Sequence, residues 1–187
     1  MLGLRHYNGT AIDLFQGDIT SFVCDAMVNA ANSSLAGGAG VDGAIHQVGG
    51  PEILRDCQQL GSCPIGEAVL TGAGKLPAKK LIHAVGPIWQ GGSHQEAELL
   101  RSTYLSSLKI AAEHRFLHIA LPSISTGAYR FPVDQAALIA MRTIREFCDE
   151  KPQALRRVTL VLFDSETYKA YQKSLFTVFP ETEGDVT

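Results

Sequence analysis

Six short apolar stretches along the chain have the length and composition of β-strands. They cover residues 11–15, 26–29, 68–71, 80–85, 117–123 and 158–163 and favour β-branched and aromatic side chains. Longer segments between them have the character of helices and cover residues 41–48, 52–60, 96–114, 132–150 and 165–176. Strands that alternate with helices predict an α/β fold with a mostly parallel sheet and helices on both faces.

Glycine and proline mark the boundaries of several predicted elements. The Gly-Gly-Pro run at residues 49–51 separates two helices, and Pro132 suits the first turn of another. Asp164 or Ser165 is the expected N-cap of the last helix. The connection 72–77 is too short for a crossover helix, so its two flanking strands are predicted to pair as an antiparallel hairpin. The sheet is therefore expected to be mixed.

The composition fits one well-buried domain and little more. The chain has 187 residues, of which 45% are hydrophobic and 19% are charged. No internal repeat, low-complexity stretch or linker interrupts it. We therefore expect a single domain over residues 1–187, with a core at about residues 11–179 and a flexible C-terminal tail at 180–187.

Charge and hydropathy exclude several functional classes. The net charge of −3 lacks the basic footprint of nucleic-acid binding, so we expect no nucleic-acid partner. No apolar run approaches the roughly 20 residues that span a bilayer, and residues 1–10 lack the apolar centre of a secretion signal. A cytoplasmic protein without a membrane partner is expected. The four cysteines form no C-x-x-C pair, which favours plain core or surface thiols over a zinc site.

A glycine-rich segment, residues 29–46, follows a buried strand and leads into a helix. Its glycines let backbone N–H groups approach a ligand, and a helix that begins near Gly40 adds the positive end of its dipole. These features predict a phosphate site, with a flexible glycine turn as the alternative. The spacing matches neither the Rossmann nor the P-loop pattern, and the loop has no lysine to hold ATP with magnesium in the Walker manner.

Three polar side chains in this segment have two interpretations each. Asn29 and Asn32 either cap the loop or face a sugar. Asp42, in the first turn of the helix, is either a partner of the helix dipole or an acid–base or hydroxyl-orienting group beside the phosphate. The glycines support binding alone, whereas Asn32 and Asp42 carry the prediction of an enzyme.

A second loop with small residues follows the strand at 117–123 and runs to Pro132. Two such loops facing each other could hold both sides of a diphosphate, with Tyr129 either packed on a ribose or at an ordinary surface position. Asp18 either caps a turn or accepts a hydrogen bond from an adenine amino group. Phe163 is either a core residue or a flat surface for a base.

Five sequence strings occur in the order and at the spacing of one known family. They are GDIT, VNAANSSL, GGAGVDGAIH, HAVGPIW and SISTGAYRFP, within a region from Gly17 to about Tyr171. The chain therefore resembles the MacroD-type macrodomains, especially the bacterial O-acetyl-ADP-ribose deacetylases. This resemblance implies a three-layer α/β/α fold with a mixed central sheet of about six strands. It also implies ADP-ribose and O-acetyl-ADP-ribose as ligands and mono-ADP-ribosylated proteins as further partners, and we expect a monomer without cofactor or metal.

The resemblance also implies roles for individual residues. Asp42 looks like the catalytic aspartate and Asn32 like a contact to the distal ribose. Asp18 looks like the carboxylate that recognises the adenine amino group, with Ile19 beside it, and Phe163 like the adenine-stacking residue. The other predicted substrate contacts are Asn29, Gly37, Gly38, Gly40 and Val41 in the first loop and Ser125, Thr126, Gly127, Ala128 and Tyr129 in the second.

Three positions depart from the family pattern. Ala39 stands where the family often has a third consecutive glycine, and its methyl group is expected to narrow the loop. Arg130 replaces a frequent glycine and adds charge near the cleft, and Phe131 replaces a frequent tyrosine of similar shape. None of these changes alters Asn32 or Asp42.

The expected reaction is hydrolysis of an acyl ester by direct attack of water. Ser125 lies in S-I-S-T-G rather than in the G-x-S-x-G of a serine nucleophile, and no metal site is evident. Asp42 would orient or deprotonate the water or the neighbouring ribose hydroxyl, unless the substrate's own phosphate does so. The alternatives are a non-catalytic ADP-ribose reader, an ADP-ribose 1″-phosphate phosphatase and an RNA-binding protein. His46 and His83 are expected to have packing or hydrogen-bonding roles.

Overall fold

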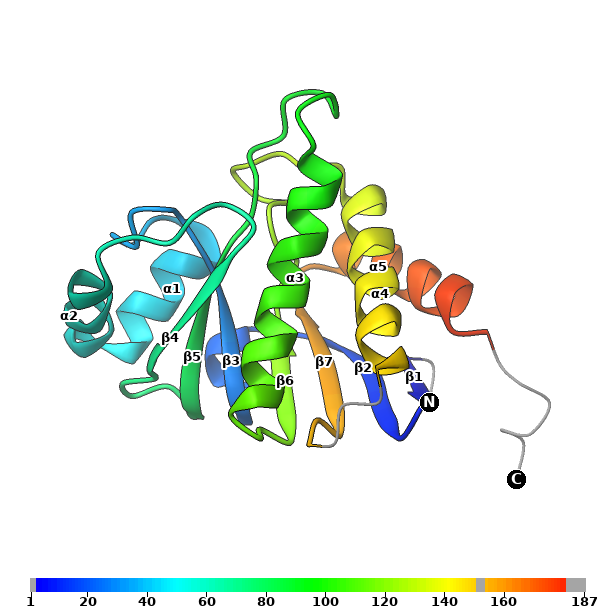
Figure 1. The fold of residues 1–187 in the computed structure, drawn as a ribbon, viewed down its shortest axis with the longest axis horizontal. Helices are drawn as coiled ribbons and strands as arrows, with labels where there is room; N and C mark the ends of the chain where they lie inside the picture. Colours follow the sequence, from blue (N-terminus) through cyan, green and yellow to red (C-terminus); the bar gives the residue numbers. More distant parts are fainter. Residues whose placement is uncertain (1–2, 151–153, 181–187) are drawn as a thin grey trace.

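A seven-stranded mixed sheet forms the middle layer of the fold (Figure 1). The computed structural model describes residues 3–150 and 154–180, so most of the expected tail, residues 181–187, lies outside the described residues. The strands are β1 (Leu4–Tyr7), β2 (Thr10–Gln16), β3 (Cys24–Ala31), β4 (Ala68–Gly72), β5 (Ala78–Val85), β6 (His118–Leu121) and β7 (Arg157–Leu162). Their order in the sheet is β1-β2-β7-β6-β3-β5-β4.

Strand direction divides this sheet into a parallel centre and antiparallel edges. β2, β7, β6, β3 and β5 pair in parallel, whereas β1 pairs with β2 and β4 with β5 in antiparallel fashion. The mixed sheet and the β4–β5 hairpin are therefore confirmed. The expected count of about six strands missed β1, because the four residues Leu4–Tyr7 include Arg5 and His6 and show no apolar run.

Five helices form the two outer layers. They are α1 (Gly40–Gly49), α2 (Pro51–Leu60), α3 (Glu96–Glu113), α4 (Val133–Asp149) and α5 (Ser165–Val178). α1 and α2 pack on one face through a core that includes Ile45, Ile53 and Met27. α3, α4 and α5 pack on the other face, where α3 and α4 lie in front of the sheet in Figure 1. The three-layer α/β/α architecture is confirmed.

The position of β3 between two helical layers explains why most of its residues are apolar. Ala26 and Val28 belong to the core beneath α3–α5, whereas Met27 faces the core beneath α1 and α2. A parallel strand covered by helices on both faces shows no alternation of polar and apolar positions. The strand has two polar residues, the partly exposed Asp25 near its start and Asn29, whose side chain has no exposed surface.

Local sequence signals fix the helix ends. α1 ends at Gly49 and α2 begins at Pro51, with Gly50 between them in the left-handed region at φ 88°. Asp164 caps α5 by accepting a hydrogen bond from Thr167 N at 2.8 Å, as predicted. Pro132 is the N-cap of α4 rather than a residue of its first turn, a shift of one position.

No helix in residues 3–150 and 154–180 is long and apolar enough to cross a membrane.

Parallel pairing places the functional loops together. Because β2, β3, β6 and β7 run in one direction, the segments that follow their carboxyl ends meet at one edge of the sheet. The two predicted ligand loops follow β3 and β6, Asp18 follows β2 and Phe163 follows β7. Residues that are up to 145 positions apart in the chain thus reach one region.

The loop between β5 and α3 is held by one buried carboxylate. Glu96 Oε1 accepts hydrogen bonds from Gln90 N at 2.9 Å and Gly92 N at 3.0 Å, and Oε2 accepts one from His94 N at 2.6 Å. Glu96 is 1% exposed. These backbone donors stabilise the ionised form against burial and lower the pKa of Glu96 to about 2.

We predict that Glu96→Gln lowers the Tm at neutral pH, because the amide accepts fewer hydrogen bonds and brings N–H groups toward donors. The folded pKa of about 2 lies below the ordinary 4.5, so this stabilisation is present above pH 4.5 and is lost as the pH falls toward 2. Thermal melts from pH 7 to pH 2 measure the gap in Tm, which should shrink with acid. Glu98→Gln, in the same helical turn but exposed, is the control. An equal effect of both substitutions, or a gap independent of pH, would contradict the assignment.

Candidate functional site

Two adjoining cavities form a cleft at the carboxyl edge of the sheet. Their volumes are about 250 Å³ and about 400 Å³, and Gly40, Val41, Ser123 and Gly127 line both of them. Among the predicted residues, the first cavity also contacts Asn32, Gly38, Asp42, Ser125, Ala128 and Tyr129, and the second also contacts Asp18, Ile19, Thr126 and Phe163. The structure therefore brings together side chains from loops that follow four different strands.

The first loop presents the N-terminus of α1 to this cleft. The N-cap residue, Ala39, makes no side-chain capping bond, and α1 begins at Gly40 with φ 59°. The N–H groups of the first helical turn have no intrahelical acceptors, so this end of α1 is suited to an anion. Gly43 lies so close beneath the loop that a Cβ there would be 2.6 Å from Gly38 O. The packing of α1 against the loop therefore requires glycine at this position.

Asn32 borders the cleft and also braces the loop. Its Nδ2 donates to Gly37 O at 2.9 Å, and its Oδ1 accepts from Ser34 Oγ at 2.9 Å and from Ala36 N at 3.2 Å. The loop-capping interpretation of Asn32 is therefore confirmed. Its contact with a sugar stays a prediction, which its place in the cavity wall permits.

Asp42 is a buried carboxylate at the wall of the first cavity, with 5% of its surface exposed. Its Oδ1 accepts from Asn29 Nδ2 at 2.7 Å and lies 3.3 Å from His46 Nε2, one helical turn further along α1. Its Oδ2 lies on the side of Gly38, where an added Cβ would be 3.2 Å away. The contacts on Oδ1 thus leave Oδ2 as the oxygen nearest the glycine loop.

Two of the predicted substrate contacts do not line either cavity. Asn29 is fully buried beneath Asp42, so its position fits support of that carboxylate rather than direct contact with a ligand. Gly37 contributes its carbonyl to Asn32 and has φ 79°, which favours glycine. The sequence alone could not show that Asn29 and Gly37 lie outside the cavity walls, because the pleat of the strand and the turn of the loop decide which way each residue faces.

The second loop follows β6 and has a strained residue at the cleft. Ser125 has φ 65° and is 7% exposed, and its Oγ has no hydrogen-bond partner in the described part of the chain. Left-handed backbone in a residue other than glycine is frequent at binding sites. Trp89 N donates to Tyr129 O at 2.9 Å, which ties this loop to the β5–α3 connection. Gly127 and Ala128 are exposed and line the first cavity.

The second cavity ends at Asp18 and Phe163. Asp18 Oδ1 accepts from Thr20 N at 2.9 Å and from Thr20 Oγ1 at 2.8 Å, which confirms the turn-capping role. Phe163 is 79% exposed, so it is not a core residue. An exposed aromatic ring beside a cavity provides a flat apolar surface at the cleft, and stacking on a base stays its predicted role.

The three departures from the family pattern have different surroundings. Ala39 is exposed and lines the first cavity. Arg130 has φ 58°, a conformation that glycine adopts more readily. Phe131 is 1% exposed and packs against Trp89, with ring centroids 4.7 Å apart. It therefore supports the second loop from inside the core.

Comparison with known families agrees with this architecture. The family model described as Macro domain matches residues 28–140, which hold both ligand loops and Asp42. The chain belongs to the macro domain family. This result confirms the resemblance that the five sequence strings indicate.

Relatives of this macrodomain match most of its length. A protein named Macro domain-containing protein TTE0995, from Caldanaerobacter subterraneus subsp. tengcongensis, is 52% identical over 87% of this chain and 94% of its own. One named O-acetyl-ADP-ribose deacetylase, from Citrobacter rodentium, is 51% identical over 88% of this chain and 94% of its own. A mutant Oceanobacillus iheyensis macrodomain solved with ADPR aligns with a TM-score of 0.90 and 38% identity, over 95% of this chain and 98% of that chain.

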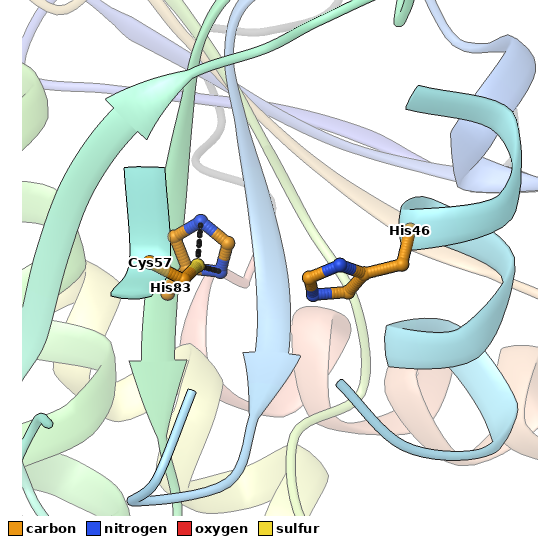
Figure 2. Close-up of side chains that lie close together, drawn as sticks. All are labelled: His46, Cys57 and His83. Carbon is orange, nitrogen blue, oxygen red and sulfur yellow. Dashed lines mark hydrogen bonds between the residues drawn. The ribbon is translucent and has the colours of Figure 1, made fainter. Parts of the chain in front are cut away.

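A buried cysteine–histidine contact lies near Asp42 in this macrodomain and is not indicated by any spacing of cysteine and histidine along the chain. Cys57 Sγ is 3.5 Å from His83 Nε2 (Figure 2). Burial and the charges of Asp42 and Asp56 raise the pKa of Cys57 to about 11, whereas burial lowers the pKa of His83 to about 4. These opposite shifts disfavour a thiolate–imidazolium pair, so Cys57 is not an activated nucleophile. All four cysteines are buried and free, as expected.

We predict that Gly86→Ala destabilises this macrodomain by about 1–3 kcal/mol. A Cβ at Gly86 would lie 2.2 Å from Ser125 Oγ and 2.6 Å from Ile124 Cγ2, so the second loop must move. An added Cβ at Gly127, in the second loop itself, would have no atom within 4 Å, so Gly127→Ala should change stability by less than about 0.5 kcal/mol. Urea unfolding of both variants measures the difference. Equal stability of the two would show that the cleft does not depend on close approach at Gly86.

Proposed function

We propose that this macrodomain is a hydrolase that binds ADP-ribose. It would remove the acyl group from O-acetyl-ADP-ribose, or ADP-ribose from acidic side chains of modified proteins. The name of the Citrobacter rodentium relative and the ADPR-bound Oceanobacillus iheyensis structure support this ligand and reaction. The observation that carries the proposal is the position of Asp42, a buried carboxylate at one end of a cleft with two loops of backbone donors.

The cleft fits the parts of ADP-ribose in order. The adenine would lie in the second cavity, with Phe163 against its face and Asp18 as acceptor for its amino group. The diphosphate would lie at the residues common to both cavities, where the N-terminus of α1 faces the second loop. The distal ribose would then reach the first cavity, which Asn32 and Asp42 border.

Hydrolysis in this site needs one water and no covalent intermediate on the protein. The water oxygen bonds to the acyl carbon, the ester C–O bond breaks, and the ribose oxygen leaves as a hydroxyl after gaining a proton. Asp42 would orient the water or take its proton through Oδ2, because Oδ1 already accepts from Asn29. Backbone N–H groups of the two loops would stabilise charge on the diphosphate and on the developing oxyanion.

The same reaction covers two substrates, since an ADP-ribosylated aspartate or glutamate is also a carboxylic ester of the distal ribose. Mono-ADP-ribosylated proteins are therefore proposed partners. A cytoplasmic location fits the four free cysteines, because thiols stay reduced there. A panel with the acyl ester, the protein-linked ester and the 1″-phosphate measures the preference. Turnover of the phosphate alone, or of none, would replace the proposal with a phosphatase or a reader.

We predict that Asp42→Ala lowers kcat for O-acetyl-ADP-ribose by roughly 10²- to 10⁴-fold, the usual contribution of a general base. Affinity for ADP-ribose should change much less, because the glycine loops provide most of the binding contacts. Single-turnover kinetics and calorimetric titration measure the two quantities. Asp134→Asn, at the start of α4 and exposed, is the control for a charge lost from a first helical turn. Full activity of Asp42→Ala would remove the carboxylate from the mechanism.

We predict that Phe163→Ala raises the Kd for ADP-ribose about tenfold, since stacking of a base on an aromatic ring contributes about 1–3 kcal/mol. The value of kcat at saturating substrate should stay within about twofold, because the adenine lies away from the reacting ester. Phe15→Ala is the matched control, as this ring is 46% exposed but does not line the cavities. Equal affinities for the two variants would mean that the base binds elsewhere.

A further inference from the structure

Three buried side chains from neighbouring strands lead to Asp42. Thr71 lies on β4, His83 on β5 and Asn29 on β3, and none is more than 6% exposed. Thr71 Oγ1 is 2.8 Å from His83 Nε2, and His83 Nδ1 is 3.1 Å from Asn29 Nδ2. The same Asn29 nitrogen donates to Asp42 Oδ1 at 2.7 Å. The side chains thus form a continuous chain of hydrogen bonds across three strands.

The donors and acceptors in this chain can be assigned from its Thr71 end. The Thr71 hydroxyl has one proton and donates it to Gly72 O at 2.9 Å, so toward His83 it is an acceptor. His83 Nε2 must therefore carry the ring proton, and Nδ1 is an unprotonated acceptor. This acceptor receives one of the two N–H bonds of the Asn29 amide.

The Asn29 amide consequently has one orientation. One N–H is directed to His83 Nδ1, and the other is directed to Asp42 Oδ1. Rotation of the amide by 180° would set its carbonyl oxygen against both an imidazole lone pair and a carboxylate oxygen, which are acceptors. The unprotonated Nδ1 of His83 and the carboxylate of Asp42 thus select the same orientation of Asn29.

We propose that His83 and Thr71 are positioning residues for the reaction. Through Asn29 they hold the Asp42 carboxylate by Oδ1, so that Oδ2 stays on the glycine-loop side where the acyl ester would bind. The proposal rests on the function assigned to Asp42 above. It adds two residues outside the cleft wall whose effect on turnover is separate from ligand affinity.

The surroundings of His83 keep its ring neutral. Burial and the nearby ring of His46, on α1, lower the pKa of His83 to about 4, against a smaller opposite effect of Asp56 on α2. Asp42 from α1 and the uncharged thiol of Cys57 from α2 complete the titratable groups near the ring. Above about pH 5 the unprotonated Nδ1 is therefore available to the amide.

A metal ion is the competing interpretation of the same cluster. His46, Cys57 and His83 offer ligand atoms that lie within 4.8 Å of one another (Figure 2). Both ring nitrogens of His83, however, already have hydrogen-bond partners in Thr71 and Asn29. Cys57 Sγ lies 3.5 Å and 3.9 Å from the two nitrogens, so it is not aligned with either of them alone. A bound metal would have to displace part of the chain that reaches Asp42.

Two substitutions at His83 test its hydrogen bond to Asn29 and its hydrogen bond to Thr71 separately. His83→Asn places an amide oxygen near the position of Nδ1 and keeps an acceptor for Asn29. His83→Gln places an amide nitrogen near Nε2, keeps a donor for Thr71 and removes that acceptor. We expect kcat to stay within about threefold for His83→Asn and to fall roughly 10- to 100-fold for His83→Gln. The Kd for ADP-ribose should stay within about threefold for both.

Thr71→Val tests the far end of the chain, with Thr143→Val as the control. Both are buried threonines, but the Thr143 hydroxyl bonds only to Ile139 O within α4 in the described contacts. We expect Thr71→Val to lower kcat with little change in Kd and Thr143→Val to change neither. Equal losses of kcat for His83→Asn and His83→Gln, or losses that follow Kd or Tm instead, would overturn the positioning role.

The imidazole ¹⁵N chemical shifts of the unmodified protein provide a readout that needs neither substrate nor a stable variant. We expect the Nε2–H tautomer of His83 from pH 6 to pH 8, without change on addition of ZnCl₂ or EDTA. The Nδ1–H tautomer, or zinc-dependent shifts of His46 and His83, would overturn the chain and favour the metal. Failure of the unmodified protein to hydrolyse any ester would instead contradict the proposed function, which the ¹⁵N experiment does not test.

Discussion

The hydrogen bond from Asn29 to Asp42 is the contact on which the site depends. It joins the central strand β3 to the first turn of α1 at 2.7 Å, and both side chains are buried. A buried carboxylate is strongly unfavourable unless hydrogen bonds compensate for the lost water. The bond therefore holds the Asp42 carboxylate at the wall of the first cavity.

The cleft is suited to an anion although its first loop has no positively charged side chain. The first loop contains no lysine or arginine, and its contribution is the N-terminus of α1 together with backbone that glycine allows to turn at Gly37 and Gly40. The second loop adds Ser125 in a strained conformation. Backbone N–H groups are rigid and cannot change protonation, so binding at this site should depend little on pH. Side-chain chemistry is concentrated at the two ends, at Asp18 with Phe163 and at Asn32 with Asp42.

Most of the fold and the cleft could be predicted from the sequence, because both depend on local signals. Apolar periodicity gave the five helices and six of the seven strands, and loops after parallel strands must share one edge. β1 was missed because an edge strand of four residues needs no apolar run. Most cleft residues lie in the two loops that follow β3 and β6, whereas Asp18 and Phe163 follow β2 and β7 and reach the same edge through the sheet.

The buried layer beneath the cleft could not be predicted, because it depends on tertiary packing. Asn29 is next to Ala30, which lines the first cavity, yet the strand pleat turns Asn29 away from it. Thr71, Cys57 and His83 lie on three separate elements, and only His83 belongs to one of the five family strings, HAVGPIW. Only the register of β4 and β5 and the packing of α2 bring them together. The exposure of Phe163 also depends on tertiary packing, because an aromatic residue at the end of an apolar strand is equally compatible with a core position.

In the proposed reaction, water attacks the acyl carbon directly while Asp42 orients it. A single turnover of O-acetyl-ADP-ribose in H₂¹⁸O, followed by mass spectrometry of acetate, ADP-ribose and protein, tests this claim. Direct attack of water predicts one ¹⁸O in the acetate and none in ADP-ribose or in the protein. Label in the ADP-ribose hydroxyl would indicate cleavage of the bond to the ribose carbon. Label in Asp42, with unlabelled acetate, would mean that the carboxylate is a nucleophile, and either result would contradict the account.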